Sequence, residues 1–408
     1  MRLRRAPLMA LALVALFAGL WGGLILLGLS LPNVAVSAGE AHGPLMALGF
    51  LGTLVSLERA VALGRWLMYV APLAAGTGAL ADLARAPGSL GPALLTLAGV
   101  VLLGAYVVLH RLQPSAHNAV MGLGAVAWCA AGVLWLSGAD VSRFTPLLAG
   151  FLVLTIVGER LELTRAVHRS EFVRRLLIGA ITVFAAGLVV SVFAERVGLR
   201  VAGVGLLAEA MWLARFDVAR RTVRMSGITR FIAVALLAGY GWLVVAGVLW
   251  TIDAPVSGGP AYDAALHAVF LGFVMSMVFA HAPVIVPALL RVSLPFRRFF
   301  YAHLALLHAS LALRLLGGDL AGNVKLWQWG GIANELAILM FLAATVHGAL
   351  SRPPAGPPSR APAARREPDQ PGPGPSLATR DGLMLPVFGL WMVHLGRWGY
   401  GTEWIAVF

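Results

Sequence analysis

The stretch APLMALALVALFAGLWGGLILLGLSL, residues 6–31, carries no charged side chain and follows the basic start MRLRR. A membrane-spanning helix needs about 20 apolar residues to cross a hydrocarbon core about 30 Å thick. The alternative, a cleavable signal peptide, has an apolar region of only about 7–15 residues. The stretch is long enough to span, so it predicts the first of a set of membrane helices.

Similar apolar runs fill the chain up to residue 350. Of its 408 residues, 59% are hydrophobic and only 12% are charged, whereas soluble domains average about 25% charged residues. So little charge cannot cover a water-exposed surface of this size, which excludes a soluble enzyme. The expected fold class is an all-α polytopic membrane protein with about twelve transmembrane helices. After residues 6–31, the expected spans are 42–63, 66–84, 90–110, 117–137, 144–164, 176–194, 199–215, 231–251, 264–290, 299–316 and 327–349.

The basic residues alternate between the two ends of these spans. Counted from a cytoplasmic N-terminus, the segments expected inside carry Arg2, Arg4, Arg5, Arg65, Arg111, Arg165, Arg169, Arg174, Arg175, Arg220, Arg221, Arg224, Arg230, Arg291, Arg297 and Arg298. The segments expected outside carry Arg85, Arg143, Arg196, Arg200 and Lys325. This pattern predicts cytoplasmic N- and C-termini in a bacterial-type inner (plasma) membrane. Topology thus explains the net charge of +13, and nucleic acid is not an expected partner.

The composition changes after the last span and predicts three regions. Residues 1–350 form the twelve-helix transmembrane domain. Residues 351–382 are rich in proline, glycine, serine and arginine, which predicts a disordered cytoplasmic linker. Residues 383–408 are apolar and aromatic but broken by proline, glycine and charges, so an interfacial segment is expected, with a thirteenth span as the alternative.

Two histidines are expected at the same depth in the membrane, near its outer side. His42 begins the span 42–63 at its outer end, and His267 lies about one turn into the span 264–290, also at its outer end. Two neutral imidazoles that face each other across a helix bundle can hold a six-coordinate haem. Glycines near them, such as Gly43 and Gly272, would let a porphyrin approach the backbone. The alternative is a pair of interfacial histidines that are hydrogen-bonded to water or headgroups.

A second group of histidines lies toward the inner ends of three consecutive spans. His281 is 14 residues after His267, which is about 21 Å deeper at about 1.5 Å per residue. With it, His303, His308 and His347 could form a second metal site, because imidazoles suit copper, zinc or iron. His303 and His308 point about 140° apart around one helix, so they are not expected to share an ion. The alternative roles for this group are packing and interfacial contacts.

Other ionisable residues lie inside the expected spans, where each is costly and suggests a function. Glu209 and Glu335 are candidates for proton handling or for a hydrogen-bonded structural role. A further group is expected to form a structural ion-pair network near the inner helix ends. Its members are Glu58, Arg59, Glu159, Arg160 and Glu162.

Two strings resemble known haem proteins. AHGPLMALGFLGT, residues 41–53, resembles the second helix of the haem–copper oxidase superfamily, where a His-Gly pair followed by methionine supplies an axial ligand of the low-spin haem. LHAVFLGFVMSMVFA, residues 266–280, resembles the helix that supplies the opposite ligand. This second string is still more similar to the NnrS family of twelve-span haem- and copper-containing membrane proteins. The resemblance covers about 35 residues in two helices.

The resemblance implies a haem b held by His42 and His267, a copper ion or second haem elsewhere, and a role in nitric oxide or respiratory redox chemistry. It implies a small gas or quinol as substrate and a separate electron donor beside the lipid bilayer, and leaves open whether the chain is a haem-dependent oxidoreductase. The spans 144–164 and 176–194 contain no histidine, unlike the copper-binding helices of the oxidases. An oxygen-reducing centre of that kind is therefore not expected.

Two other function classes fit the same sequence. A twelve-span secondary transporter without haem would use buried Glu209 and Glu335 and the helix break near Pro283. A structural subunit of a respiratory complex would have no chemistry of its own. Bound haem distinguishes the first interpretation from both alternatives.

Overall fold

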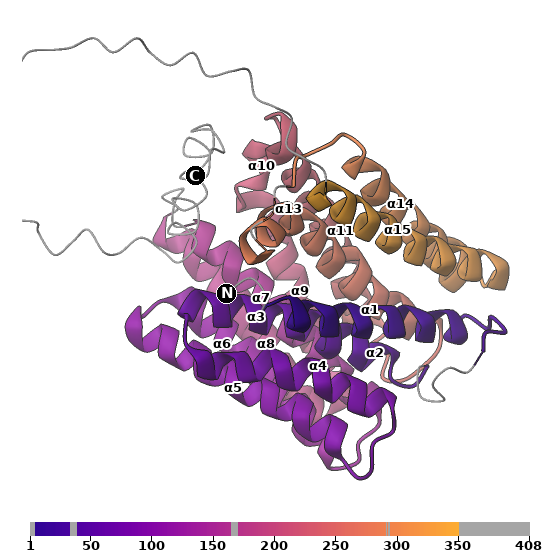
Figure 1. The fold of residues 1–408 in the computed structure, drawn as a ribbon. Coiled ribbons are helices and arrows are strands. Elements are labelled where there is room, and N and C mark those ends of the chain that lie inside the picture. The colour runs from indigo at the N-terminus through magenta and orange to yellow at the C-terminus, as the bar shows by residue number, and fades with distance from the viewer. Residues whose placement is uncertain (1–4, 33–38, 165–169, 291, 293, 351–408) are drawn as a thin grey trace, which may run out of the picture.

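The protein is described here by a computed structural model, which covers residues 5–32, 39–164, 170–290, 292 and 294–350. The expected linker 351–382 and the expected interfacial segment 383–408 lie outside the described residues. Within these ranges every regular element is a helix and no strand occurs (Figure 1). A helix pairs its backbone N–H and C=O groups within one segment, as the water-free membrane interior requires. The all-α fold class is thereby confirmed.

The helices follow one another with short connections. The N-terminal half contains α1 (Ala6–Leu26), α2 (His42–Pro44), η2 (Leu45–Gly52), α3 (Thr53–Leu63), η3 (Trp66–Tyr69), α4 (Val70–Leu83), α5 (Leu90–Leu112), α6 (Ala116–Leu136), α7 (Val141–Thr164) and α8 (Glu171–Phe193). The C-terminal half contains α9 (Glu195–Phe216), α10 (Ala219–Thr222), α11 (Gly227–Ile252), α12 (Pro260–His267), η5 (Ala268–Met275), α13 (Ser276–Leu290), α14 (Phe300–Ala312), η6 (Leu313–Leu320) and α15 (Val324–Leu350).

Eleven helices in the described ranges are long and apolar enough to cross a membrane, one fewer than expected. The expected span 66–84 is not among these eleven. Its start forms the 4-residue 3₁₀-helix η3, which leaves only 14 residues in α4. A 3₁₀-helix rises about 2.0 Å per residue and an α-helix about 1.5 Å, so the two together reach about 29 Å. This length still matches a hydrocarbon core.

The two ends of the described chain show that Trp66–Leu83 makes a full crossing of the bundle. Helices α1 and α15 run antiparallel: Gln328 donates to the carbonyl of Leu27, and Gly23 lies against Glu335. Residues 6 and 350 therefore lie at the same end of the bundle, away from the end where α1 stops and α15 starts (Figure 1). Such an arrangement needs an even number of crossings, which the eleven long helices reach only together with η3 and α4.

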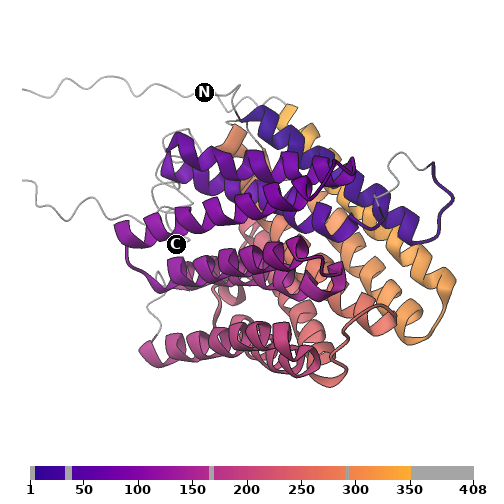
Figure 2. The same cartoon turned by 90° about the horizontal axis from the view of Figure 1, so that it is seen from below.

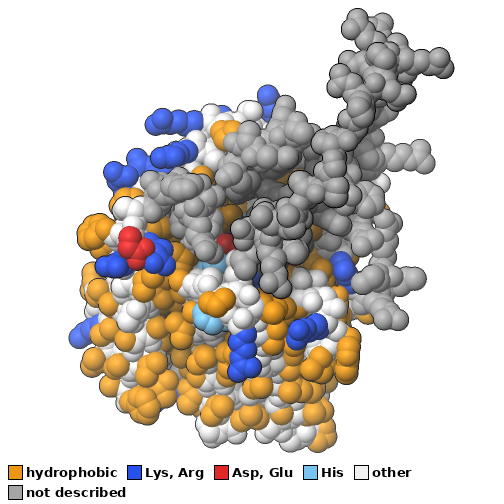
Figure 3. All heavy atoms as spheres, turned by 90° about the vertical axis from the view of Figure 1, so that its left-hand side faces the viewer, with side chains coloured by type: hydrophobic (Ala, Val, Ile, Leu, Met, Phe, Trp, Pro, Cys, Tyr) orange, Lys and Arg blue, Asp and Glu red, His pale blue; other side chains and the backbone are white. Residues whose placement is uncertain are grey.

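Exposed arginines gather at the end of the bundle where α1 begins (Figure 3). Those that the structure describes there are Arg65, Arg111, Arg174, Arg175, Arg220, Arg221, Arg224, Arg230, Arg297 and Arg298. We call this end the arginine-rich face and the opposite end the His42 face. The charge distribution agrees with the predicted alternation, and the cytoplasmic location of the arginine-rich face stays a prediction.

Three spans form the centre of the bundle. In their most apolar windows, 78% of the residues of α7, 67% of those of His42–Leu63 and 61% of those of Pro260–Leu290 are buried inside the protein. The other candidate spans have lower values. Figure 2 shows the long helices running side by side along the bundle. The two spans that begin near His42 and His267 are thus central, where side chains meet each other and not lipid.

Glycines allow the closest helix contacts around this centre. A Cβ atom at Gly247 of α11 would lie 2.9 Å from the backbone nitrogen of Leu207 and 3.1 Å from the carbonyl oxygen of Gly203, both on α9. A Cβ atom at Gly241, on the same helix, would meet nothing within 4 Å. The backbone of α9 cannot move aside as a flexible side chain would, so Gly247 is required for this contact.

We predict that Gly247→Ala destabilises the protein by about 1–3 kcal/mol, because the added methyl overpacks the α9–α11 contact. Gly241→Ala is the matched control and should be neutral or stabilising by up to about 1 kcal/mol, since alanine favours helix more than glycine does. Thermal unfolding of both variants in detergent measures the difference. Equal melting temperatures for the two variants would contradict the packing argument.

Candidate functional site

One cavity collects the residues that the sequence singled out at the His42 face. It has a volume of about 290 Å³ and lies between α1, η2, α7, the α12–η5 segment, η6 and α15. His42 and His267 both line it, although they are far apart in the chain. Its volume is near the lower end of the range for small-molecule sites, about 300–1,000 Å³. The structure therefore brings together the two histidines that we paired from their heights.

Backbone carbonyls hold both imidazole rings through Nδ1. Nδ1 of His42 lies 2.7 Å from the carbonyl oxygen of Gly19 on α1, and Nδ1 of His267 lies 2.8 Å from that of Asp263. A carbonyl only accepts, so Nδ1 carries the hydrogen in each neutral ring and Nε2 keeps a lone pair. Within the described part of the chain neither Nε2 has a hydrogen-bond partner. Metal-ligating histidines are commonly fixed in this way.

A carboxylate and a guanidinium complete the wall beside His267. Asp263 Oδ1 lies 3.1 Å from His267 Nδ1, and Arg314 donates to both oxygens of Asp263 at 2.9 and 2.7 Å. Trp327 Nε1 also donates to Asp263, at 3.1 Å, and its ring lies 5.2 Å from the Arg314 guanidinium carbon. Asp263 thus connects its own span with η6 and α15. Its carboxylate also compensates the positive charge that Arg314 places at the cavity.

The residues predicted for the site from the sequence included neither Arg314 nor Asp263. The four-residue spacing of Asp263 and His267 was the available signal, because residues four apart share one face of a helix. An arginine inside the expected span 299–316 was a second signal, since such residues are costly in lipid. The pairing of the two could not be read from sequence, because 51 residues separate them.

Three π-helices in the described ranges surround the cavity. Met46 and Leu51 of η2, Phe270 and Leu271 of η5, and Arg314 of η6 all line it. A π-helix holds one extra residue per turn, is rare, and often occurs at functional sites. Each π-helix therefore changes the direction in which the side chains after it point, relative to the side chains before it. The cavity is thus the place where three central helices depart from regular geometry.

Of the two glycines singled out near the histidines, only one lines the cavity. Gly43 lines the cavity, but Gly272 packs against Trp242 and a Cβ there would collide with that ring. At Gly23 of α1, a Cβ would lie 2.7 Å from Glu335 Oε1 and 3.1 Å from His42 Cε1. Glu335 therefore faces the cavity beside His42, and Gly23 makes room for both side chains.

The structure does not bring the second group of histidines together. His281 Nε2 accepts a hydrogen bond from Arg160 at 2.8 Å, and His308 Nδ1 accepts one from Trp242 at 2.9 Å. His303 is buried among four phenylalanine rings, and His347 is exposed near the end of α15. In the described ranges no three His, Cys, Asp or Glu side chains are arranged to hold a metal ion. The predicted second metal site thus has no support in this arrangement.

The remaining expected polar residues separate into two cases. The ion-pair network is present, with Arg59 2.5 Å from Glu159. Glu209 is fully buried on α9, and neither of its carboxylate oxygens has a partner among the described residues. A carboxylate in such a place is costly when charged.

Comparison with known proteins gives a family but no activity. Residues 5–350 match the model of a domain of unknown function, DUF8744. The chain belongs to the DUF8744 family. The match covers all the described helices, and no curated protein matches the chain. The resemblance to NnrS and oxidase proteins therefore rests on the residues of helices α2–α3 and α12–α13.

We predict that Asp263→Asn destabilises the protein by at least about 2 kcal/mol, because the buried Arg314 guanidinium loses its charged partner. Glu40→Gln is the control, because it removes the exposed carboxylate paired with Arg85 and should change stability by at most about 1 kcal/mol. Thermal unfolding in detergent compares the two. A loss of stability that is no larger for Asp263→Asn than for the control would refute the structural role of the Asp263–Arg314 pair.

Proposed function

We propose that this chain is a haem-binding integral membrane protein in which His42 and His267 are the two axial ligands. The observation that carries the proposal is that both imidazoles line one cavity, each fixed through Nδ1 and each with an Nε2 lone pair free. Neutral imidazole nitrogens are the donors that haem iron uses in membrane helix bundles. Two such nitrogens are the donor set that a haem b would need.

The other cavity residues suit the rest of such a group. Leu266, Phe270 and Met275 are apolar and match a porphyrin ring. Arg314 offers a positive charge for carboxylate substituents, and Asp263 holds this charge in place through two hydrogen bonds. His42 and His267 lie among the central helices and are only partly exposed, and such partial burial would tune the redox potential of a bound group.

The chemistry that follows is electron transfer. A haem with two protein ligands exchanges electrons and has no open position for a gas. The connection with nitric oxide or respiratory redox chemistry is a proposal that rests on the resemblance of helices α2–α3 and α12–α13 to the NnrS and oxidase proteins. The electron donor would be a separate protein or a quinol in the membrane.

We predict that the purified protein shows the reduced-minus-oxidised bands of a low-spin haem b, and that His42→Ala and His267→Ala each remove them. Each variant loses one of two iron ligands, so the remaining histidine cannot maintain six-coordination. His110→Ala is the control, because this histidine is exposed near the end of α5. Spectra and pyridine haemochrome assays measure the haem content per chain.

Wild-type protein without haem bands, after expression in cells supplied with a haem precursor, would contradict the proposal and favour a transporter or a structural subunit. Haem bands that persist in both alanine variants would show that other residues of the chain bind the haem. Loss of the bands in His110→Ala as well would show a general effect of substitution.

A further inference from the structure

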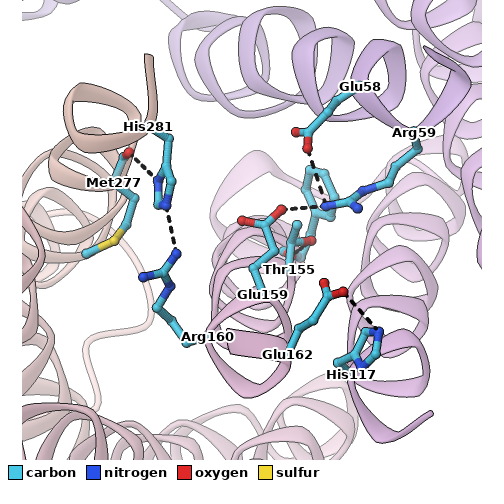
Figure 4. A network of polar contacts seen from close by, with 10 residues as sticks. Glu58, Arg59, His117, Thr155, Glu159, Arg160, Glu162, Met277 and His281 are labelled. Carbon is cyan, nitrogen blue, oxygen red and sulfur yellow. Dashed lines mark hydrogen bonds and ion pairs between the residues drawn. The ribbon is translucent and has the colours of Figure 1, made fainter. Parts of the chain in front are cut away.

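A buried ionic network lies at the other end of the central helices, near the arginine-rich face. Helix α7 contributes Glu159, Arg160 and Glu162, which contact three different neighbours (Figure 4). Glu159 binds Arg59 of α3, Arg160 binds His281 of α13, and Glu162 lies 3.8 Å from His117 of α6. The side chains of Glu58 and Glu162 are 18% and 13% exposed, so the network reaches the edge of the protein.

Two hydroxyl groups above this network lack the partner that such groups normally have. Thr53 and Ser56 of α3 are fully buried, and neither hydroxyl has a hydrogen bond within the described part of the chain. Other helical hydroxyls in this protein close onto the carbonyl four residues earlier. Examples are Thr96, Thr145, Thr155, Thr182, Thr251, Ser276, Ser310 and Thr345. Thr53 and Ser56 therefore keep their hydrogen-bonding capacity for something else.

More unpartnered polar atoms lie around the same part of α3. Thr53, Ser56 and Arg59 follow one another along α3 at three-residue steps, each turned about 60° from the one before. The Tyr106 ring lies 5.9 Å from the Arg59 guanidinium carbon, and its hydroxyl is buried without a partner, as is Arg59 Nε. The Trp128 ring packs against Gly52, and its Nε1 is also unpartnered. We call Thr53, Ser56, Arg59, Tyr106 and Trp128 the α3 column.

The α3 column lies between the network and the cavity along the bundle. Its lower member Arg59 belongs to the network, and its upper member Thr53 begins α3 directly after η2, whose Leu51 lines the cavity. The cavity in turn is lined by Glu40, whose side chain is 78% exposed at the His42 face. The network, the α3 column and the cavity thus follow one another in depth from the arginine-rich face to the His42 face.

A buried polar atom without a partner costs about 1–3 kcal/mol, so several in one place need an explanation. Ordered water supplies the missing bonds in protein interiors, where each molecule makes about three. Ionisable residues inside membrane proteins commonly border such water and mark proton routes.

We propose that ordered water fills the α3 column and conducts protons between the arginine-rich face and the cavity. Each hop passes a proton from one hydrogen-bonded oxygen to the next, so only O–H bonds form and break, and the chain of oxygens is restored when the waters turn. Glu58 and Glu159 compensate the charge of Arg59, which lowers its repulsion of a proton. The inference holds whether or not the cavity binds haem.

The route has features that favour protons over metal cations. A metal ion needs several oxygen or nitrogen ligands around one point. No such group of carboxylates and imidazoles exists in the described ranges. The hydroxyl, phenol and indole groups of the α3 column can each bond one water, which is enough for a single file of molecules.

The test uses the full chain in liposomes that contain a pH-sensitive dye. A potassium gradient with valinomycin imposes a membrane potential, and dye fluorescence reports proton uptake. We expect uptake faster than in protein-free liposomes, and a fall to the protein-free rate in the double variant Thr53→Val/Ser56→Ala. The matched control is Ser191→Ala/Thr345→Val, because both of these buried hydroxyls are bonded to a carbonyl of their own helix. This control should conduct as wild type does.

Rescue and stability measurements keep the result interpretable. Thr53→Ser/Ser56→Thr retains both hydroxyls and should keep the wild-type rate, which separates the hydrogen-bonding groups from simple packing. If the column is dry, Thr53→Val/Ser56→Ala removes two unsatisfied groups and should raise the melting temperature; if it is hydrated, the melting temperature stays level or falls. A wild-type rate equal to that of protein-free liposomes would overturn the inference. Unchanged conduction in Thr53→Val/Ser56→Ala, together with a raised melting temperature, would overturn it as well.

Discussion

The membrane interior lacks water, so each polar atom there must find its partner within the protein. This constraint explains the most ordered parts of the site. The Nδ1 atoms of His42 and His267 face carbonyls, and Asp263 receives donors from Arg314 and Trp327. The same constraint makes the exceptions informative. The free Nε2 atoms point to a ligand, and the unpartnered hydroxyls of the α3 column point to water.

The three π-helices show how a regular bundle accommodates such a site. A straight α-helix repeats its contacts every 3.6 residues, so two packed helices fill the space between them evenly. An inserted residue changes the phase of the helix, and the side chains after it face a new direction. This change begins three residues after His42 in η2 and directly after His267 in η5. The histidines can then face the cavity while the helices below remain packed through the centre.

Much of the fold followed from local composition. Spans, their order and their approximate ends were predictable because apolar runs of about 20 residues have few alternatives in a membrane. The segment Trp66–Leu83 shows the limit, since its short 3₁₀ start depends on how the chain turns after Gly64 and packs beside α5. That His42 and His267 lie at one depth was predictable, because both stand near the outer ends of their spans, but that they line one cavity depended on which helices pack together. The shared depth of Arg59 and Glu159 at the opposite ends was predictable for the same reason.

The sequence by itself determined the fold class, the alternation of basic residues and the heights of the histidines, because hydropathy and position along a helix are local properties. Only the tertiary structure decided which residues at one height meet. Asp263 and Arg314 pair while His303 and His308 remain apart from His281, since helix rotation and neighbour choice depend on packing across the whole bundle. The unpartnered state of Thr53 and Ser56 was likewise invisible in the sequence, because a helical hydroxyl normally bonds its own backbone.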